Sequence, residues 1–384
     1  MLPGKKYCMA AENPDITGKP ESEQTAGKES GPPLGGRRDK AQKEGESRGL
    51  FTIGVSPHIR DKDTTASIMG WVIIALLPIT AYGIYIGGRS ALVVVAMSII
   101  GAVATEAAIQ RLRHVPVTVN DLSALLTGLL LGLTLPPNLP WWMPLIGGAV
   151  AIAIGKQVFG GLGHNIFNPA LVGRAVLFVS WSKYMTTSYL VNAKAAVVTN
   201  ATVKGINTVT KATPLAAQGL VRKDELAISA SRYYKPLLLG NPWGCIGEVS
   251  AVLILLGLAI LLARGLVDWR IPVFYVGTVV ALSWILGMDP LFAMLSGGLL
   301  FGACFMATDY VTNPMTGWGK VVFAICCGIV TTVLRFYSSL PEGVMFAILL
   351  MNGFTPLIDR YITPRAFGHN GLFARKTEQS KEAA

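Results

Sequence analysis

Long apolar runs separated by short polar segments dominate the chain, and they fall into two groups of five. Most of them are long enough to cross a hydrocarbon layer of about 30 Å as helices, at about 1.5 Å per residue. The pattern therefore predicts an all-α polytopic membrane protein with about ten transmembrane helices. The runs cover roughly 66–86, 90–109, 122–135, 142–159 and 169–181, then 247–263, 271–287, 291–307, 319–337 and 342–358.

The run at 122–135 is shorter than the others. As a helix it reaches only about 21 Å, less than the hydrocarbon thickness. We therefore expect a half-helix at this position.

Composition supports a membrane protein and argues against a nucleic-acid partner. Hydrophobic residues make up 52% of the 384 residues and charged residues only 14%, whereas soluble domains contain about 25% charged residues. The formal net charge is +11, but the basic residues lie at the ends of apolar runs rather than on one face. We therefore expect contact with membrane lipid and no nucleic-acid partner.

The basic residues of the short loops also predict orientation. Short loops rich in Lys and Arg stay in the cytoplasm, whereas long loops cross the membrane largely regardless of their charge. If the runs alternate, both termini are cytoplasmic and the long loop at 182–246 lies outside. The residues that mark the cytoplasmic side are Arg111, Arg113, Lys156, Arg264, Arg270, Lys320, Arg360, Arg365, Arg375 and Lys376.

These features divide the chain into five parts. Residues 1–50 are rich in Gly, Pro, Glu, Lys and Ser, a composition that predicts a disordered polar cytoplasmic extension. Residues 51–181 form the first five-helix half, 182–246 the outer loop, 247–358 the second five-helix half and 359–384 a cytoplasmic tail.

The two halves are weakly alike in sequence. LLTGLLLG at 125–132 is similar to LSGGLLFG at 295–302, and NPALVG at 168–173 is similar to NPMTG at 313–317. With five helices per half, a duplication is inverted in the membrane, an arrangement that uses broken helices and places sites near the midplane. We therefore expect two inverted halves.

Two polar stretches near helix ends are candidates for binding. GGLGHNIFNPALVGRA, at 160–175, has glycines for irregular backbone, and Asn168 precedes a proline suited to the first turn of a helix. MATDYVTNPMTGWGK, at 306–320, has the same character and contains Asn313. Each stretch either wraps a ligand or is a plain turn between cytoplasmic helix ends.

Glu106 and Asp309 are the candidates for ion coupling. An ionisable group near a membrane segment is costly to bury and is by default a functional candidate for a Na⁺ or H⁺ path. Both lie near predicted cytoplasmic ends, so the alternative is a solvated or arginine-paired carboxylate.

Other kinds of site have little support. The five cysteines include no CxxC pair and no zinc spacing, which argues against a disulfide framework. Three of them lie inside apolar runs, where we expect small buried hydrophobes, although a metal shared between helices or subunits stays open. His164 is expected to cap a helix or face solvent. Walker A, GxGxxG and HExxH patterns do not occur.

The long polar loop carries a recognisable motif. TVTKATPLA at 208–216 resembles the flavin-attachment motif of two homologous membrane proteins, the D subunit of the Rnf complex and the B subunit of the Na⁺-pumping NADH:quinone reductase. Thr210, Ala212 and Thr213 match that motif, whereas Asn207 and Lys211 depart from it. SPHIR at 56–60, the 160–175 stretch, TDYVTNP at 308–314 and the ten-run layout resemble the same family, and ATPLA favours the Rnf protein.

The resemblance implies an electron-transfer subunit of a ferredoxin:NAD⁺ oxidoreductase that couples electron flow to Na⁺ or H⁺ transport. It implies a urea-transporter-like fold, a covalent FMN joined through its phosphate to Thr213, and a non-covalent flavin such as riboflavin among the helices. Thr210, Lys211, Asn168 and Asn313 are the accompanying candidates for cofactor binding, and Lys211 could pair with the phosphate.

The implied partners are a flavin transferase and the C, G, A, E and B types of subunit of the same complex. The implied location is the cytoplasmic membrane of a prokaryote. Three alternatives stay open: a component like the B subunit of the quinone reductase, a urea-transporter-like solute channel without flavin, and a purely structural membrane subunit.

Overall fold

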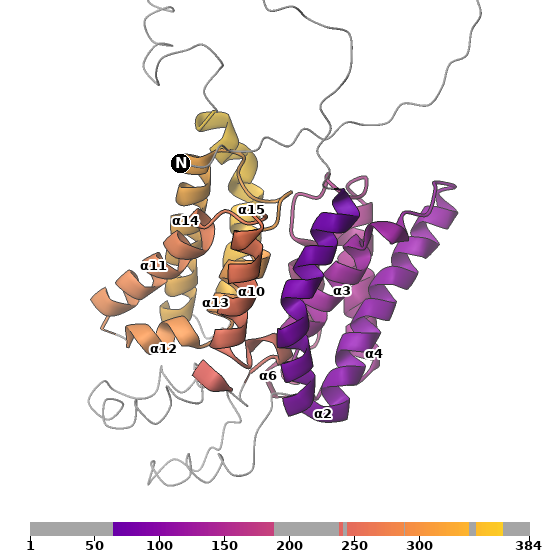
Figure 1. The fold of residues 1–384 in the computed structure, drawn as a ribbon, viewed down its shortest axis with the longest axis horizontal. Coiled ribbons are helices and arrows are strands. Elements are labelled where there is room, and N and C mark those ends of the chain that lie inside the picture. The colour runs from indigo at the N-terminus through magenta and orange to yellow at the C-terminus, as the bar shows by residue number, and fades with distance from the viewer. Residues whose placement is uncertain (1–63, 188–237, 241–243, 288, 338–342, 364–384) are drawn as a thin grey trace, which may run out of the picture. The chain divides into compact units, whose positions relative to one another are not determined.

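The computed structural model describes residues 64–187, 238–240, 244–287, 289–337 and 343–363 (Figure 1). Within these ranges every regular element is a helix, as the apolar pattern predicts. The polar extension at 1–50, the motif at 208–216 and most of the tail lie outside the described residues.

The first two apolar runs form α2 (Thr65–Leu112), which contains a break. Thr64 caps its start by accepting a hydrogen bond from the Ser67 amide at 3.2 Å. Gly88 has φ 64° and ψ −150°, a backbone conformation that is essentially restricted to glycine. The two arms of α2 on either side of Gly88 therefore correspond to the two predicted runs.

The remaining elements of the first half are short, and two of them are irregular. Leu122, with φ 62°, turns the chain sharply before α3, whose 12 residues match the short predicted run. The end of α4 widens into a π-helical turn, η2, a form that often occurs at functional sites. The elements are η1 (Val119–Asp121), α3 (Ser123–Thr134), α4 (Trp142–Ile152), η2 (Ala153–Gln157), α5 (Pro169–Ser180) and α6 (Ser182–Thr187).

In the second half, the run at 291–307 is not the single helix that its length predicts. Gly297 and Gly298 both have positive φ and turn the chain between two short helices. Arg335 of α14 donates hydrogen bonds to three carbonyls at this break, at 2.8 to 3.0 Å. The elements are η3 (Ile246–Glu248), α10 (Ala251–Ala263), α11 (Arg270–Ile285), α12 (Pro290–Leu295), α13 (Leu299–Phe301), η4 (Gly302–Met306), α14 (Gly317–Tyr337) and α15 (Gly343–Tyr361).

Glycines allow the helices to approach closely. In the first half α2 packs against α3 and α4, and in the second half α14 packs against α11 and α15 (Figure 1). A Cβ atom on Gly148 would lie 2.4 Å from the carbonyl oxygen of Ser98, and one on Gly101 would lie 2.3 Å from that of Leu145. Backbone contact of this kind is typical of helices packed in membranes. The halves meet where α10 packs on α2 and α15 packs on α5.

Apolar side chains face outward while charged ones are buried. Among the described residues, α2 and α14 are long and apolar enough to cross a membrane, and α3, α5, α10 and α11 are shorter apolar helices. Leu77, Leu350 and Phe354 are about half exposed, whereas Glu106 and Lys156 are almost completely buried. This distribution reverses that of soluble proteins and fits a lipid environment.

The second sequence similarity between the halves is partly reproduced in the structure. A π-helical turn precedes each Asn-Pro pair, η2 before Asn168 and η4 before Asn313. Asn168 caps α5 directly, whereas α14 begins only at Gly317, four residues after Asn313. The two stretches therefore share their irregular approach but differ in how the next helix starts.

Candidate functional site

A pocket lies between helices of the first half and the stretch around η4. Its empty space, counted together with space open to the surroundings, is about 800 Å³. Apolar side chains, among them Leu126, Leu130 and Phe305, form much of its wall. We call it the interhelical pocket. Its polar lining residues are Ser123, Thr127, Lys156, Asn165, Asn168, Thr308, Asp309 and Tyr310.

A buried ion pair lies at one wall of the interhelical pocket. The Nζ atom of Lys156 lies 2.5 Å from Oε1 of Glu106 and donates to Oγ of Ser123 at 2.6 Å. The two charged side chains are 3% and 0% exposed. Solvent screens such a pair little, so its electrostatic interaction is strong.

This geometry corrects two expectations. Glu106 is neither solvated nor paired with arginine, because it lies inside the helix packing where η2 brings a lysine to it. Lys156 does not mark a cytoplasmic loop, because the π-helical turn η2 points its side chain into the protein.

Hydrogen bonds to Glu106 are unevenly distributed over its two oxygens. Besides Lys156, Oε1 accepts from Nε2 of Gln110 and of Gln157, each at 3.3 Å. Among the described residues Oε2 has no hydrogen-bond partner, although it is buried. Because buried polar atoms are nearly always satisfied, Oε2 is a position that a proton or a cation can occupy.

The glycine-rich stretch before α5 wraps one side of the pocket. Gly160, Gly161 and Gly163 have positive φ, so the chain bends in ways that side chains disfavour. Asn168 accepts from the Ala170 amide at 3.0 Å and donates to the Met306 carbonyl at 3.2 Å, which joins the start of α5 to η4. The stretch at 160–175 is therefore more than a turn, since it positions pocket-lining groups of both halves.

Asp309 lines the same pocket from the second half. It is partly buried and accepts a hydrogen bond from Oγ1 of Thr312 at 3.3 Å. Burial raises the pKa of Asp309 to about 6. Asp309 is therefore not a freely solvated surface carboxylate, because it is partly buried in the pocket wall. Asn313 is half-buried and is not among the residues that line the pocket.

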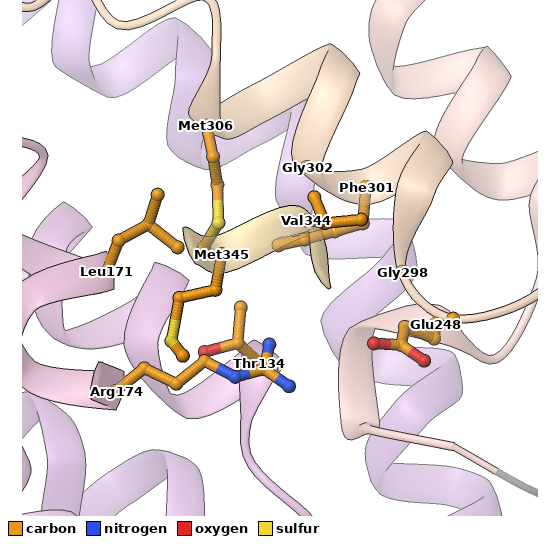
Figure 2. Close-up of a pocket in the computed structure, with 11 residues that line it drawn as sticks. Thr134, Leu171, Arg174, Glu248, Gly298, Phe301, Gly302, Met306, Val344 and Met345 are labelled. Atoms are coloured by element: carbon orange, nitrogen blue, oxygen red, sulfur yellow. The ribbon is translucent and has the colours of Figure 1, made fainter. Parts of the chain in front are cut away.

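A smaller pocket, with about 320 Å³ of empty space, lies farther along α3 and α5. Figure 2 shows Arg174 from α5 and Glu248 from η3 pointing toward one another across it, with Thr134 beside the guanidinium group. Gly298 allows Glu248 its place, since a Cβ there would lie 2.5 Å from Oε1 of Glu248. Each pocket is thus lined by one basic and one acidic side chain, Lys156 and Asp309 in the interhelical pocket and Arg174 and Glu248 in the smaller one.

The structure brings some of the predicted site residues together and does not describe others. Glu106, Asn168 and Asp309 all lie at or beside the interhelical pocket. Thr210, Lys211 and Thr213 lie outside the described residues. His164 is exposed, and the described part of the chain contains no group of three or more His, Cys, Asp or Glu able to hold a metal.

Lys156, Ser123 and Glu248 were not predicted as site residues. Lys156 had a usable signal, because a charge inside the apolar run 142–159 is costly unless it is paired. Ser123 had none, since a serine in an apolar helix is common and its role depends on which lysine it meets.

Comparison with known proteins identifies the family. The sequence profile of the NQR2, RnfD, RnfE family matches residues 52–368. The D subunit of the Na⁺-translocating ferredoxin:NAD⁺ oxidoreductase complex of Acetobacterium woodii is 46% identical over 318 residues, 83% of this chain and 95% of the relative.

Two further relatives agree. The D subunit of the proton-translocating ferredoxin:NAD⁺ oxidoreductase complex of Clostridium ljungdahlii is 44% identical over 331 residues, covering 84% of this chain and 97% of the relative. The D subunit of an ion-translocating oxidoreductase complex of Stutzerimonas stutzeri is 40% identical over 342 residues, covering 82% and 97%. The chain therefore belongs to the NQR2, RnfD, RnfE family of membrane proteins.

Proposed function

We propose that this chain is the D subunit of a membrane complex that transfers electrons between reduced ferredoxin and NAD⁺ and couples them to cation transport. The observation that carries the proposal is identity of 40 to 46% to D subunits of ion-translocating oxidoreductases over more than four-fifths of the chain. The chain acts within the complex rather than alone. Its partners are the C, G, A, E and B types of subunit and a flavin transferase.

A covalent FMN on Thr213 is the first part of the redox role. The proposal rests on the match of Thr210, Ala212 and Thr213 to the attachment motif, with the Lys211 ammonium available to the phosphate. A tether suits a one-electron relay, because the linker sets the local concentration of the flavin. The protein then places and tunes a cofactor that supplies the redox chemistry.

In-gel fluorescence tests the attachment. The denatured band of the Thr213→Ala protein loses its flavin fluorescence, while that of Thr210→Ala, which keeps the acceptor hydroxyl, retains it at least in part. The tryptic peptide containing Thr213 carries the added mass of an FMN phosphodiester. Fluorescence that survives Thr213→Ala removes this assignment.

The interhelical pocket is the proposed place for the non-covalent flavin. Its apolar walls suit a planar ring system, and Asn165 and Asn168 offer polar groups to its edge. When bound, such a flavin would accept and pass on single electrons. Asn313 is the weaker of the two asparagine candidates, because it does not line the pocket.

Released flavin measures this second site. Denaturation of the Thr213→Ala protein releases one flavin per chain if the pocket holds it. Introducing bulk with Leu130→Trp, on the apolar wall, lowers that amount without affecting the covalent band. A Thr213→Ala protein that releases no flavin refutes the pocket assignment.

Glu106 and Asp309 are the proposed coupling residues. Glu106 has a buried oxygen without a hydrogen-bond partner among the described residues, and Asp309 is partly buried on the pocket wall. The relatives named for Na⁺ and for protons are nearly equal in identity, so both ions are tested. Glu106→Gln and Asp309→Asn lower ion uptake into vesicles relative to electron transfer, and unchanged coupling in both variants eliminates them.

Two inverted five-helix halves in the cytoplasmic membrane, with both termini in the cytoplasm, complete the proposal. The π-helical turns before the two Asn-Pro pairs support a duplication, and the basic loops support the orientation. Labelling of single cysteines placed in the loop at 136–140 and in the tail at 364–384 tests this orientation. The two cysteines must react from opposite sides of the membrane.

A urea-transporter-like channel is the competing function. It predicts a colourless purified protein and solute uptake by the isolated chain. A role like that of the quinone reductase protein instead predicts electron transfer to quinone.

A further inference from the structure

The two oxygens of Glu106 are in different situations, and Lys156 is the cause. Oε1 receives the ammonium group and two glutamine amides, while Oε2 is buried without a hydrogen-bond partner among the described residues. Glu106 is therefore neutralised by one internal cation but not saturated by hydrogen bonds. A second positive charge at Oε2 would be next to the first.

Lys156 is placed so that it can give way. Its side chain forms part of the wall of the interhelical pocket, and the same pocket contains Asp309. Its other acceptor is Oγ of Ser123, which in turn donates to Asp121 at 2.6 Å. Arg113 lies close by and donates to the carbonyl of Gln157 at 3.3 Å.

We propose that the Lys156 ammonium group is a tethered counter-cation that competes with Na⁺ for Glu106. Na⁺ binds at Oε2 only as the ammonium group withdraws toward the pocket, where Asp309 is the available carboxylate. This inference rests on the proposed function of Glu106 as a coupling residue. It assigns Lys156 the role of setting the apparent Na⁺ affinity.

The physical reason is charge balance in a medium that screens poorly. Two cations on one buried carboxylate repel each other strongly, so the presence of one weakens the binding of the other. The π-helical turn η2 is an irregular part of the helix that brings Lys156 to Glu106, and such turns often occur at functional sites. Replacing Lys156 by a neutral side chain of similar length removes the competitor and leaves the carboxylate for Na⁺.

The test uses membrane vesicles that contain the whole complex, with Na⁺ as the probe. Electron transfer from reduced ferredoxin to NAD⁺ and ²²Na⁺ uptake are measured as Na⁺ concentration is varied. Lys156→Met lowers the half-saturating Na⁺ concentration at least about fivefold, the lower end of usual coupling between sites. Lys156→Arg, which keeps the charge, stays near the wild-type value.

Lys320→Met is the matched control, because Lys320 also pairs with a carboxylate, Asp268 at 3.2 Å, but does not line the pocket. It leaves the half-saturating concentration unchanged. Ser123→Ala provides a second variant in case Lys156→Met does not assemble. It loosens the ammonium group and lowers the half-saturating concentration by a smaller factor.

Flavin fluorescence of the same preparations separates the two levels of the proposal. If the Lys156→Met and Ser123→Ala complexes have normal flavin and electron transfer but an unchanged half-saturating Na⁺ concentration, the counter-cation role alone is overturned. Wild-type transport that ignores Na⁺ overturns it as well. Absence of flavin from the wild-type chain instead refutes the redox function.

Discussion

Breaking the Glu106–Lys156 pair from either side should destabilise the protein far more than removing both charges. The perturbations are Glu106→Gln, Lys156→Met and the double variant. Each single change leaves one charge buried in helices where its partner was 2.5 Å away and both side chains were at most 3% exposed. The double change leaves two neutral side chains of nearly native size.

The size of the effect follows from this burial. Removing one partner of a buried ion pair costs about 3–5 kcal/mol, whereas replacing both by neutral groups is often close to neutral. In Glu106→Gln the stranded ammonium group keeps Ser123 as an acceptor, which favours the lower end of that range. A loss of about 2 °C in midpoint per kcal/mol, suited to a large chain, gives a fall of about 6–10 °C for each single variant.

Thermal unfolding of the detergent-solubilised complex measures this at neutral pH in Na⁺-free buffer and at one scan rate, because membrane proteins often unfold irreversibly. Adding Na⁺ should raise the midpoint of Lys156→Met more than that of the wild type. Two equal single-variant losses that simply add in the double variant would refute the pair as the source of the effect. A double variant no better than the worse single variant would do the same.

The remaining predictions concern packing, capping and pH. Gly148→Ala should lower the unfolding free energy by about 1–3 kcal/mol, because its Cβ would overlap the Ser98 carbonyl and force α2 and α4 apart. Gly277→Ala is the control, since no atom lies within 4 Å of its Cβ, and it should be neutral or slightly stabilising; equal losses in both would contradict the packing analysis. Asn168→Ala should cost about 0.5–2 kcal/mol as a lost helix cap, measured by the same melts. Asp309 has a raised pKa of about 6, so folding favours its protonated form. The stability that this group contributes is therefore lost as pH rises from the ordinary aspartate pKa through about 6. Infrared spectra should show a protonated carboxyl band that fades over that interval and is missing in Asp309→Asn; a band that does not change as the pH crosses the Asp309 pKa would contradict the prediction.

Local patterns in the sequence were enough to predict the helical runs and most of their ends. Apolar runs of sufficient length have few alternatives to helix in lipid, because every backbone polar group must be satisfied within the segment. The break at Gly88 lies between the predicted runs 66–86 and 90–109. The Asn168–Pro169 pair marked the start of α5, because capping and proline geometry are local. Glu106 and Asp309 stood out for the same kind of reason, the cost of a charge near a membrane segment.

The contacts that those residues make depend on how the helices pack, which no local pattern predicts. The break at Gly297 and Gly298 was missed, because glycine is also common in unbroken membrane helices and its backbone angles depend on packing. The partner of Glu106 is Lys156, 50 positions away in the chain, and no local sequence pattern predicts a contact between residues so far apart. A hydrogen bond likewise joins Asn168 to Met306, 138 positions apart. Run length and caps are properties of neighbouring residues, whereas pairing of buried charges depends on which helices pack together.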